Sequence, residues 1–266
     1  MAGEIDWIAL ESLAMAQQAE DDAAERRYLA RPNILLCIEV ALRLRDLSKA
    51  KRLEGDYAGA EALCRQALEI VEKEFGPEGM WVARVLNDLA QLLWESNDLV
   101  AAEKLFRRAI AIEENYHGPE DHLYVAPGLI CLAQVLTEQG EYAAAEPLYR
   151  RALPIKEKER GPDHPEVADA LCKLADVLEK QAEYAAAEPL YRRALAIQEK
   201  ERGPDHLDVA RVLLYLAEVL RKQGDSIFQP YAAAEPLYRR ALEIGEKHLG
   251  SEHPYVNHIV SRLGGG

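Results

Sequence analysis

The chain has 266 residues, a formal net charge of −14 at pH 7 and only 7% aromatic residues. This surplus of negative charge repels phosphate backbones and anionic lipid headgroups, so we expect neither nucleic acid nor a membrane surface as a partner. The four cysteines are far apart and have no CxxC or finger spacing, which is typical of reduced thiols in a cytoplasmic protein without a metal or other cofactor.

The first predicted element is an acidic helix within residues 4–29, with apolar side chains at Ile5, Ile8, Leu10 and Leu13. Terminal units of repeat proteins are atypical because they must shield an otherwise exposed apolar face. We therefore interpret residues 1–30 as an N-terminal capping helix. The segment has neither the basic start of a signal peptide nor an apolar run long enough to cross a membrane.

From residue 31 to residue 263 the sequence repeats itself about every 42 residues. The phrase Tyr-Ala-x-Ala-Glu-x-Leu starts at Tyr57, Tyr142, Tyr184 and Tyr231, and Leu99 replaces the tyrosine once. Such a period indicates stacked helix pairs, none of which buries its apolar face alone. We expect an all-α fold, a right-handed superhelical solenoid of five antiparallel helix pairs plus the first helix of a sixth, followed by a glycine tail at residues 264–266.

One repeat, from Val167 to Gly203, illustrates the expected pair. Apolar residues at helical spacing from Val167 predict a first helix, with Asp163 as its N-cap and Glu166 as the capping-box partner. A second helix is expected from about Ala185 to Arg202, and the following Gly203 ends it.

Small residues stand at one position of every first helix, namely Ser48, Ala90, Ala133, Ala175 and Ala217. This pattern resembles the tetratricopeptide repeat, and the longer period with its Gly-Pro-Asp-His linker resembles the kinesin light chain type. Residues 82–90 are similar to the Val-Ala-x-x-Leu-Asn-Asn-Leu-Ala phrase of that family. The resemblance implies a scaffold or adaptor that binds a peptide or protein segment in a concave groove. Because Glu4-Ile5-Asp6-Trp7 resembles the tryptophan-acidic peptides that such repeats bind, the first helix is alternatively a ligand for its own groove.

The resemblance also implies which side chains of the first helices face the groove. These positions are Arg45, Lys49, Arg52, Arg84, Asn87, Gln91, Ile130, Gln134, Thr137, Asp169, Cys172, Asp176, Glu179, Arg211, Leu214, Glu218 and Arg221. The first two repeats are basic at these positions, which predicts an acidic portion in the partner. An insertion at residues 226–230 carries Ile227 and Phe228, which either fold back on the array or form a contact loop.

Catalysis is not expected from this chain. His122, His164, His206 and His253 recur once per repeat, about 20 Å apart, so they cannot converge on one metal, and we interpret them as helix-start and linker residues. The sequence holds no HExxH, GxSxG or P-loop motif.

Two alternatives to a free-standing adaptor remain open, and both follow from the sixth repeat, which lacks its second helix. One is a regulatory or sensor module of a larger effector enzyme, such as a protease or an NTPase, of which this chain is a fragment. The other is a self-assembling scaffold that forms homo-oligomers through an open C-terminal face.

Overall fold

The computed structural model of the chain describes residues 32–118, 124–223 and 230–263, and in these ranges the chain folds into helices joined by short turns. The predicted capping helix, the contact loop at Ile227 and Phe228, the glycine tail and His122 lie outside the described residues. The chain divides into two compact units, Met1–Leu92 and Leu93–Gly266, and each unit is described by itself.

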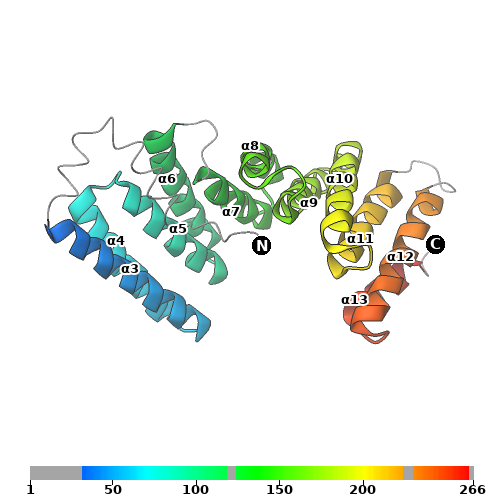
Figure 1. Cartoon of the computed structure of the whole chain (residues 1–266), viewed down its shortest axis with the longest axis horizontal. Coiled ribbons are helices and arrows are strands. Elements are labelled where there is room, and N and C mark those ends of the chain that lie inside the picture. The colour runs from blue at the N-terminus through cyan, green and yellow to red at the C-terminus, as the bar shows by residue number, and fades with distance from the viewer. Residues whose placement is uncertain (1–31, 119–123, 224–229, 264–266) are drawn as a thin grey trace, which may run out of the picture. The chain divides into compact units, whose positions relative to one another are not determined.

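The first unit contains α3 (Pro32–Leu53), α4 (Tyr57–Phe75) and most of α5 (Met80–Glu95). Helices α3 and α4 pack against each other as an antiparallel pair (Figure 1). The small residue Ser48 lies between them, where its hydroxyl donates to the carbonyl oxygen of Ala60 at 2.9 Å. Asp56 begins α4 by accepting the backbone N–H of Gly59, as expected of an N-cap.

The second unit continues the series of paired helices, and each helix packs against the next along the chain. Its members, shown in chain order from green to red in Figure 1, are α6 (Leu99–His117), α7 (Val125–Glu138), α8 (Tyr142–Arg160), α9 (Pro165–Lys180), α10 (Tyr184–Arg202), α11 (Leu207–Gln223), α12 (Pro230–Leu249) and α13 (Pro254–Leu263). The last of these is the expected first helix of a sixth repeat, and its Val256 and Ile259 are buried. The predicted all-α array of helix pairs is confirmed.

Alanines and aromatic rings share the core of the second unit. Ala175 of α9 and Ala187 and Ala194 of α10 are fully buried where the two helices meet. Larger aromatic side chains, one from each of α6, α8, α10 and α12, are also buried: Phe106, Tyr149, Tyr191 and Tyr238. Small side chains let paired helices approach closely, and equivalent positions of successive repeats bury the same kind of side chain, so the packing repeats with the sequence.

The recurring histidines were predicted to begin the first helices of the repeats, and the three that the structure describes do so. The Nδ1 atoms of His164, His206 and His253 accept the backbone N–H two residues ahead at 3.2, 3.1 and 3.2 Å. The prediction that Asp163 is the N-cap of α9 is wrong, because His164 takes that position. The Asp163 carboxylate instead pairs with Lys200 of α10 at 2.5 Å, which also lowers the pKa of Asp163.

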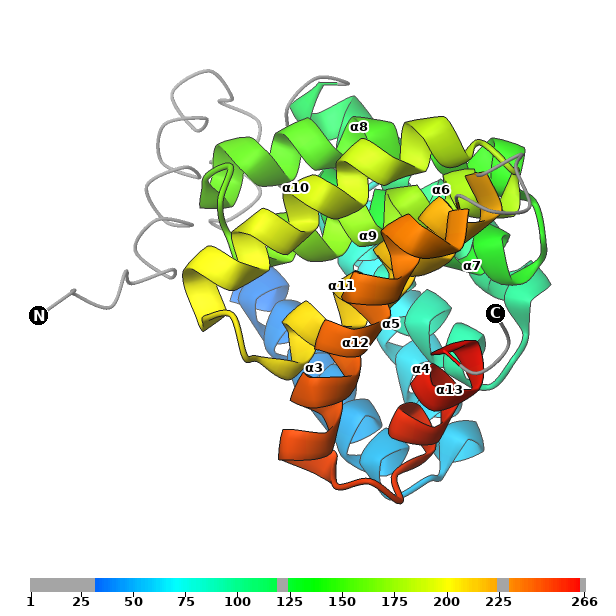
Figure 2. The same ribbon diagram turned by 90° about the vertical axis from the view of Figure 1, so that its right-hand side faces the viewer.

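Ion pairs join second helices that are one repeat apart. Arg193 of α10 bonds Glu157 of α8 at 2.5 Å, and Arg240 of α12 bonds Glu199 of α10 at the same distance. Figure 2 shows α8 and α10 running side by side, which allows this contact. The same arginines donate to the carbonyl oxygens of Pro162 and Pro204 in the linkers, so each linker is held by the repeat that follows it.

Candidate functional site

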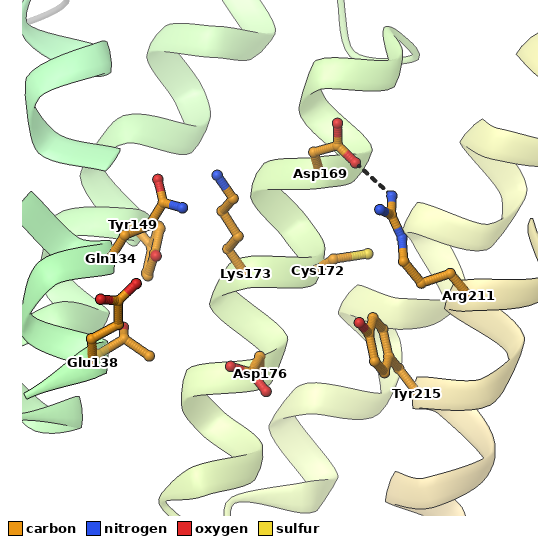
Figure 3. Close-up of a pocket in the computed structure, with 10 residues that line it drawn as sticks. Gln134, Glu138, Tyr149, Asp169, Cys172, Lys173, Asp176, Arg211 and Tyr215 are labelled. Carbon is orange, nitrogen blue, oxygen red and sulfur yellow. Dashed lines mark hydrogen bonds and ion pairs between the residues drawn. The ribbon is translucent and has the colours of Figure 1, made fainter. Parts of the chain in front are cut away.

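A polar groove lies on the second unit, where the first helices of three successive repeats face the same space. It has a volume of about 490 Å³. Its lining comes from α7, α9 and α11, with one residue from α8: Gln134, Thr137, Glu138, Tyr149, Asp169, Cys172, Lys173, Asp176, Arg211 and Tyr215. Figure 3 shows these side chains arranged across the three helices, with α9 in the middle.

Several charges of the groove have partners inside the protein. Arg211 of α11 bonds Asp169 of α9 at 3.2 Å and Asp208 at 3.1 Å, which ties the two helices together at one end of the groove. At α7, Glu138 accepts the indole N–H of Trp94 at 2.8 Å. These groups are held by neighbours and serve as walls of the groove.

Two other charges of the groove, Lys173 and Asp176, form no hydrogen bond or ion pair with any other residue that the structure describes. Both are half-buried on successive turns of α9, and in Figure 3 they extend in opposite directions along the helix. Burial lowers the pKa of Lys173 and raises the pKa of Asp176, because each charged form loses water. The groove therefore holds one cation and one carboxylate that lack full solvation.

Beside these charges the groove has aromatic and apolar groups (Figure 3). Tyr215 is exposed on α11, with its ring centroid 5.7 Å from that of the buried Tyr191. Burial raises the pKa of the Cys172 thiol to about 12 and also raises that of Tyr149, so both groups stay neutral at physiological pH. Such a surface can bury apolar atoms of a ligand while its charges fix orientation.

The structure brings together part of the predicted set and excludes another part. Gln134, Thr137, Asp169, Cys172, Asp176 and Arg211 line the groove, whereas Ile130 and Glu179 lie outside its lining. The expectation that Leu214 and Glu218 are exposed is wrong, since they are 6% and 8% exposed. Leu214 belongs to the core around α12, and Glu218 accepts the Tyr238 hydroxyl at 2.8 Å.

Two ion pairs complete the surroundings of Glu218. Its carboxylate bonds the predicted groove residue Arg221 at 2.9 Å and lies 3.0 Å from Arg262 of α13. Burial alone would raise the pKa of Glu218, but the hydrogen bonds from Arg221 and Tyr238 outweigh it, and the pKa is lowered. This cluster anchors α13 on α11 and is structural.

Sequence reasoning missed Glu138, Tyr149, Lys173 and Tyr215. Two of them share one position of the repeat: Lys173 and Tyr215 stand two residues before the small residues Ala175 and Ala217. The prediction had instead chosen the residue three positions before the small residue, which is Cys172 or Leu214. One residue turns the helix by about 100°, enough to exchange a buried for an exposed side chain. The sequence contained an indication of this, because the position holds Cys131, Lys173 and Tyr215 in successive repeats. A position that accepts such different side chains is not restricted by packing in the core.

The predicted basic end of the groove, in the first unit, is a small cleft of about 40 Å³. Its lining includes Arg45, Lys49, Arg52 and Gln91. The expectation that Arg45 is exposed is wrong, because it is 7% exposed and its guanidinium forms an ion pair with Asp88 of α5, which also lines the cleft.

The remaining predicted residues of this unit are more accessible. Arg84 is exposed and stands 5.8 Å from the ring of Trp81, and Lys49 is also exposed. Asn87 is half-buried, and its side-chain oxygen is shielded from water and accepts no hydrogen bond.

The described residues form neither a metal-binding cluster nor a membrane-spanning helix. Among the residues described, no three His, Cys, Asp or Glu side chains come together as a metal site. None of the described helices combines the length and apolarity that a bilayer span requires.

The comparison with known families agrees with this geometry. A family model described as tetratricopeptide repeat matches residues 39–115, 124–200 and 171–226, and another with the same description matches residues 209–255. The chain belongs to the tetratricopeptide repeat family. A search of curated proteins gave no match.

Solved structures show the same fold at low sequence identity. BtubC (BKLC) from P. vanneervenii is 23% identical, with a TM-score of 0.69 over 90% of this chain and 92% of that one. A kinesin light chain-like protein of Podosopora anserina with nearly identical repeats is 19% identical, with a TM-score of 0.67 over 78% of this chain and 95% of that one. YrrB, a tetratricopeptide protein with an unusual peptide-binding site, is 15% identical, with a TM-score of 0.56 over 83% and 92% of the two chains. The predicted tetratricopeptide repeat is confirmed, and a kinesin light chain-like repeat protein is among the structures that share its fold. Family and fold support a protein-interaction scaffold in general.

Proposed function

We propose that this chain is an adaptor that binds a peptide or protein segment in the groove of α7, α9 and α11. The observation that carries the proposal is the groove itself, which has about 490 Å³ of space and presents Lys173, Asp176 and Tyr215 on two rigid helices. Polar groups held by packed helices around an apolar floor are what a recognition site needs. YrrB, a structural neighbour, has a peptide-binding site on the same kind of fold.

The test uses a photocrosslinking amino acid, benzoylphenylalanine, at position 215 in the groove. A matched control carries it at position 100, where Val100 is 60% exposed on α6 and does not line the groove. After irradiation in a lysate, crosslinked peptides are identified by mass spectrometry, and the segment found is synthesised.

The expected result is a recurring short segment attached at position 215 and absent at position 100, whose synthetic form competes with the crosslink. If both positions capture the same proteins, or the synthetic segment does not compete, the groove is not the binding site and the proposal is wrong.

A further inference from the structure

The two charges without protein partners define what the groove would recognise. Lys173 and Asp176 are three residues apart on α9, so their Cβ atoms lie about 5–6 Å apart on one helix face. Nevertheless they do not pair with each other, and Figure 3 shows them extending in opposite directions. Neither charge forms a hydrogen bond or ion pair with a described residue of α7 or α11, where Glu138 is bonded to Trp94 and Arg211 to Asp169. Asp169 attracts Lys173, and Lys180 and Lys222 attract Asp176, only through longer-range electrostatics.

Half-buried charges without partners cost folding free energy that neutral side chains would not cost. Another half-buried cation of the second unit, Lys156, is paired with Glu159 and Glu166 at 3.2 Å. Lys173 and Asp176 differ from it, because neither has such a partner among the described residues. A ligand that brings opposite charges to both groups would recover this cost upon binding.

We propose that the groove recognises a segment with one acidic and one basic side chain, whose carboxylate pairs with Lys173 and whose cation pairs with Asp176. This inference rests on the proposed function of the groove. In an extended segment, side chains two or four residues apart share a face and are about 7 or 13 Å apart. Such spacing fits two charges that diverge from adjacent helical turns, with the intervening backbone over Cys172 and Tyr215.

The same geometry disfavours a purely acidic segment in the second unit. A second carboxylate would meet Asp176, and like charges in a partly desolvated site repel. The prediction that the partner carries an acidic portion therefore applies only to the first unit, where Lys49 and Arg52 line the small cleft.

A change of specificity tests the proposal more sharply than a loss of binding. Displayed random 12-residue peptides are selected against the full chain and against Asp176→Lys, which replaces the carboxylate beside Lys173 by a second lysine. Asp176 has no hydrogen bond or ion pair with a described residue to lose, and thermal unfolding followed by circular dichroism verifies the fold of each variant. Glu201→Lys is the matched control, because it makes the same charge change at an exposed position of α10 outside the groove.

The original chain and Glu201→Lys are expected to enrich peptides with an acid and a base two or four residues apart. Asp176→Lys is expected to enrich peptides with two acids at the same spacing and to bind the mixed-charge peptides about tenfold more weakly. Identical enrichment for the original chain and Asp176→Lys would overturn the charge assignment while leaving groove binding intact. No enrichment over Tyr215→Arg, which replaces the aromatic ring of the groove by a further cation, would overturn groove binding itself.

Discussion

The buried ion pair between Arg45 and Asp88 offers a sharp test of the first unit. The Arg45 side chain is 9% exposed and that of Asp88 24% exposed, so water reaches the carboxylate but hardly reaches the guanidinium. Replacing one partner of a buried pair costs about 3–5 kcal/mol when the other charge stays buried. Asp88→Ala, which strands the arginine, should therefore lower the free energy of unfolding by about 3 kcal/mol.

The reverse replacement should cost less. In Arg45→Met the apolar part of the side chain is retained, and the remaining Asp88 can be hydrated, so the expected loss is about 1–2 kcal/mol. The double variant should be less destabilised than the sum of the two, because neither charge is then left without its partner.

Equilibrium urea unfolding, followed by circular dichroism, measures all three variants. Arg84→Glu is the control, because Arg84 is exposed and its reversal should change stability by less than about 0.5 kcal/mol. If Arg45→Met is the more damaging single replacement, or if both fall within 0.5 kcal/mol of the original chain, the structural role assigned to this pair is refuted. The result also decides which arginine can report on an acidic partner, since only Arg84 can be reversed without disturbing the fold.

Three further predictions concern the second unit. Ala182 follows the end of α9 with φ of 63°, a conformation that favours glycine, so Ala182→Gly should raise the free energy of unfolding in urea by about 0.5–1 kcal/mol. Gly140→Ala, at φ of 82°, should lower it by about 1–2 kcal/mol, and a change of stability in the same direction for both variants would contradict this reasoning. The folded-state pKa of Glu218 is below its unfolded value, so its contribution is present above the usual pKa of 4.5 and is lost as the pH falls through the folded value. Glu218→Gln should accordingly weaken the pH dependence of stability below about pH 4.5, and an unchanged acid limb of the stability profile would refute it. The pKa of about 12 at Cys172 predicts that iodoacetamide at pH 8 labels this thiol at least about tenfold more slowly than in urea, as peptide mapping would show; equal rates would contradict its burial.

The groove shows where sequence reasoning succeeded and where it failed. Assigning the first helices of the repeats to the groove was sufficient to find Gln134 and Asp176, because both follow the small residue by one position. It failed for Leu214, which is buried, and for Lys173, which is half-buried at the next position of the preceding repeat and lines the groove. The period identifies equivalent positions, but it does not state which side of each helix the neighbouring pair will cover.

The repeat alone was sufficient to determine the helices and their order, and their ends to within one or two residues, as the shift of the α9 N-cap from Asp163 to His164 shows. Those features depend on contacts within a few residues, such as the Asp56 side chain at Gly59 and the glycine turns at Gly76 and Gly203. The tertiary structure decided which charges have partners. Arg45 with Asp88, and Arg211 with Asp169, are 43 and 42 residues apart, so each pair exists only because helices one repeat apart pack side by side. The same packing leaves Lys173 and Asp176 without a hydrogen bond or ion pair to any residue that the structure describes, and both line the groove.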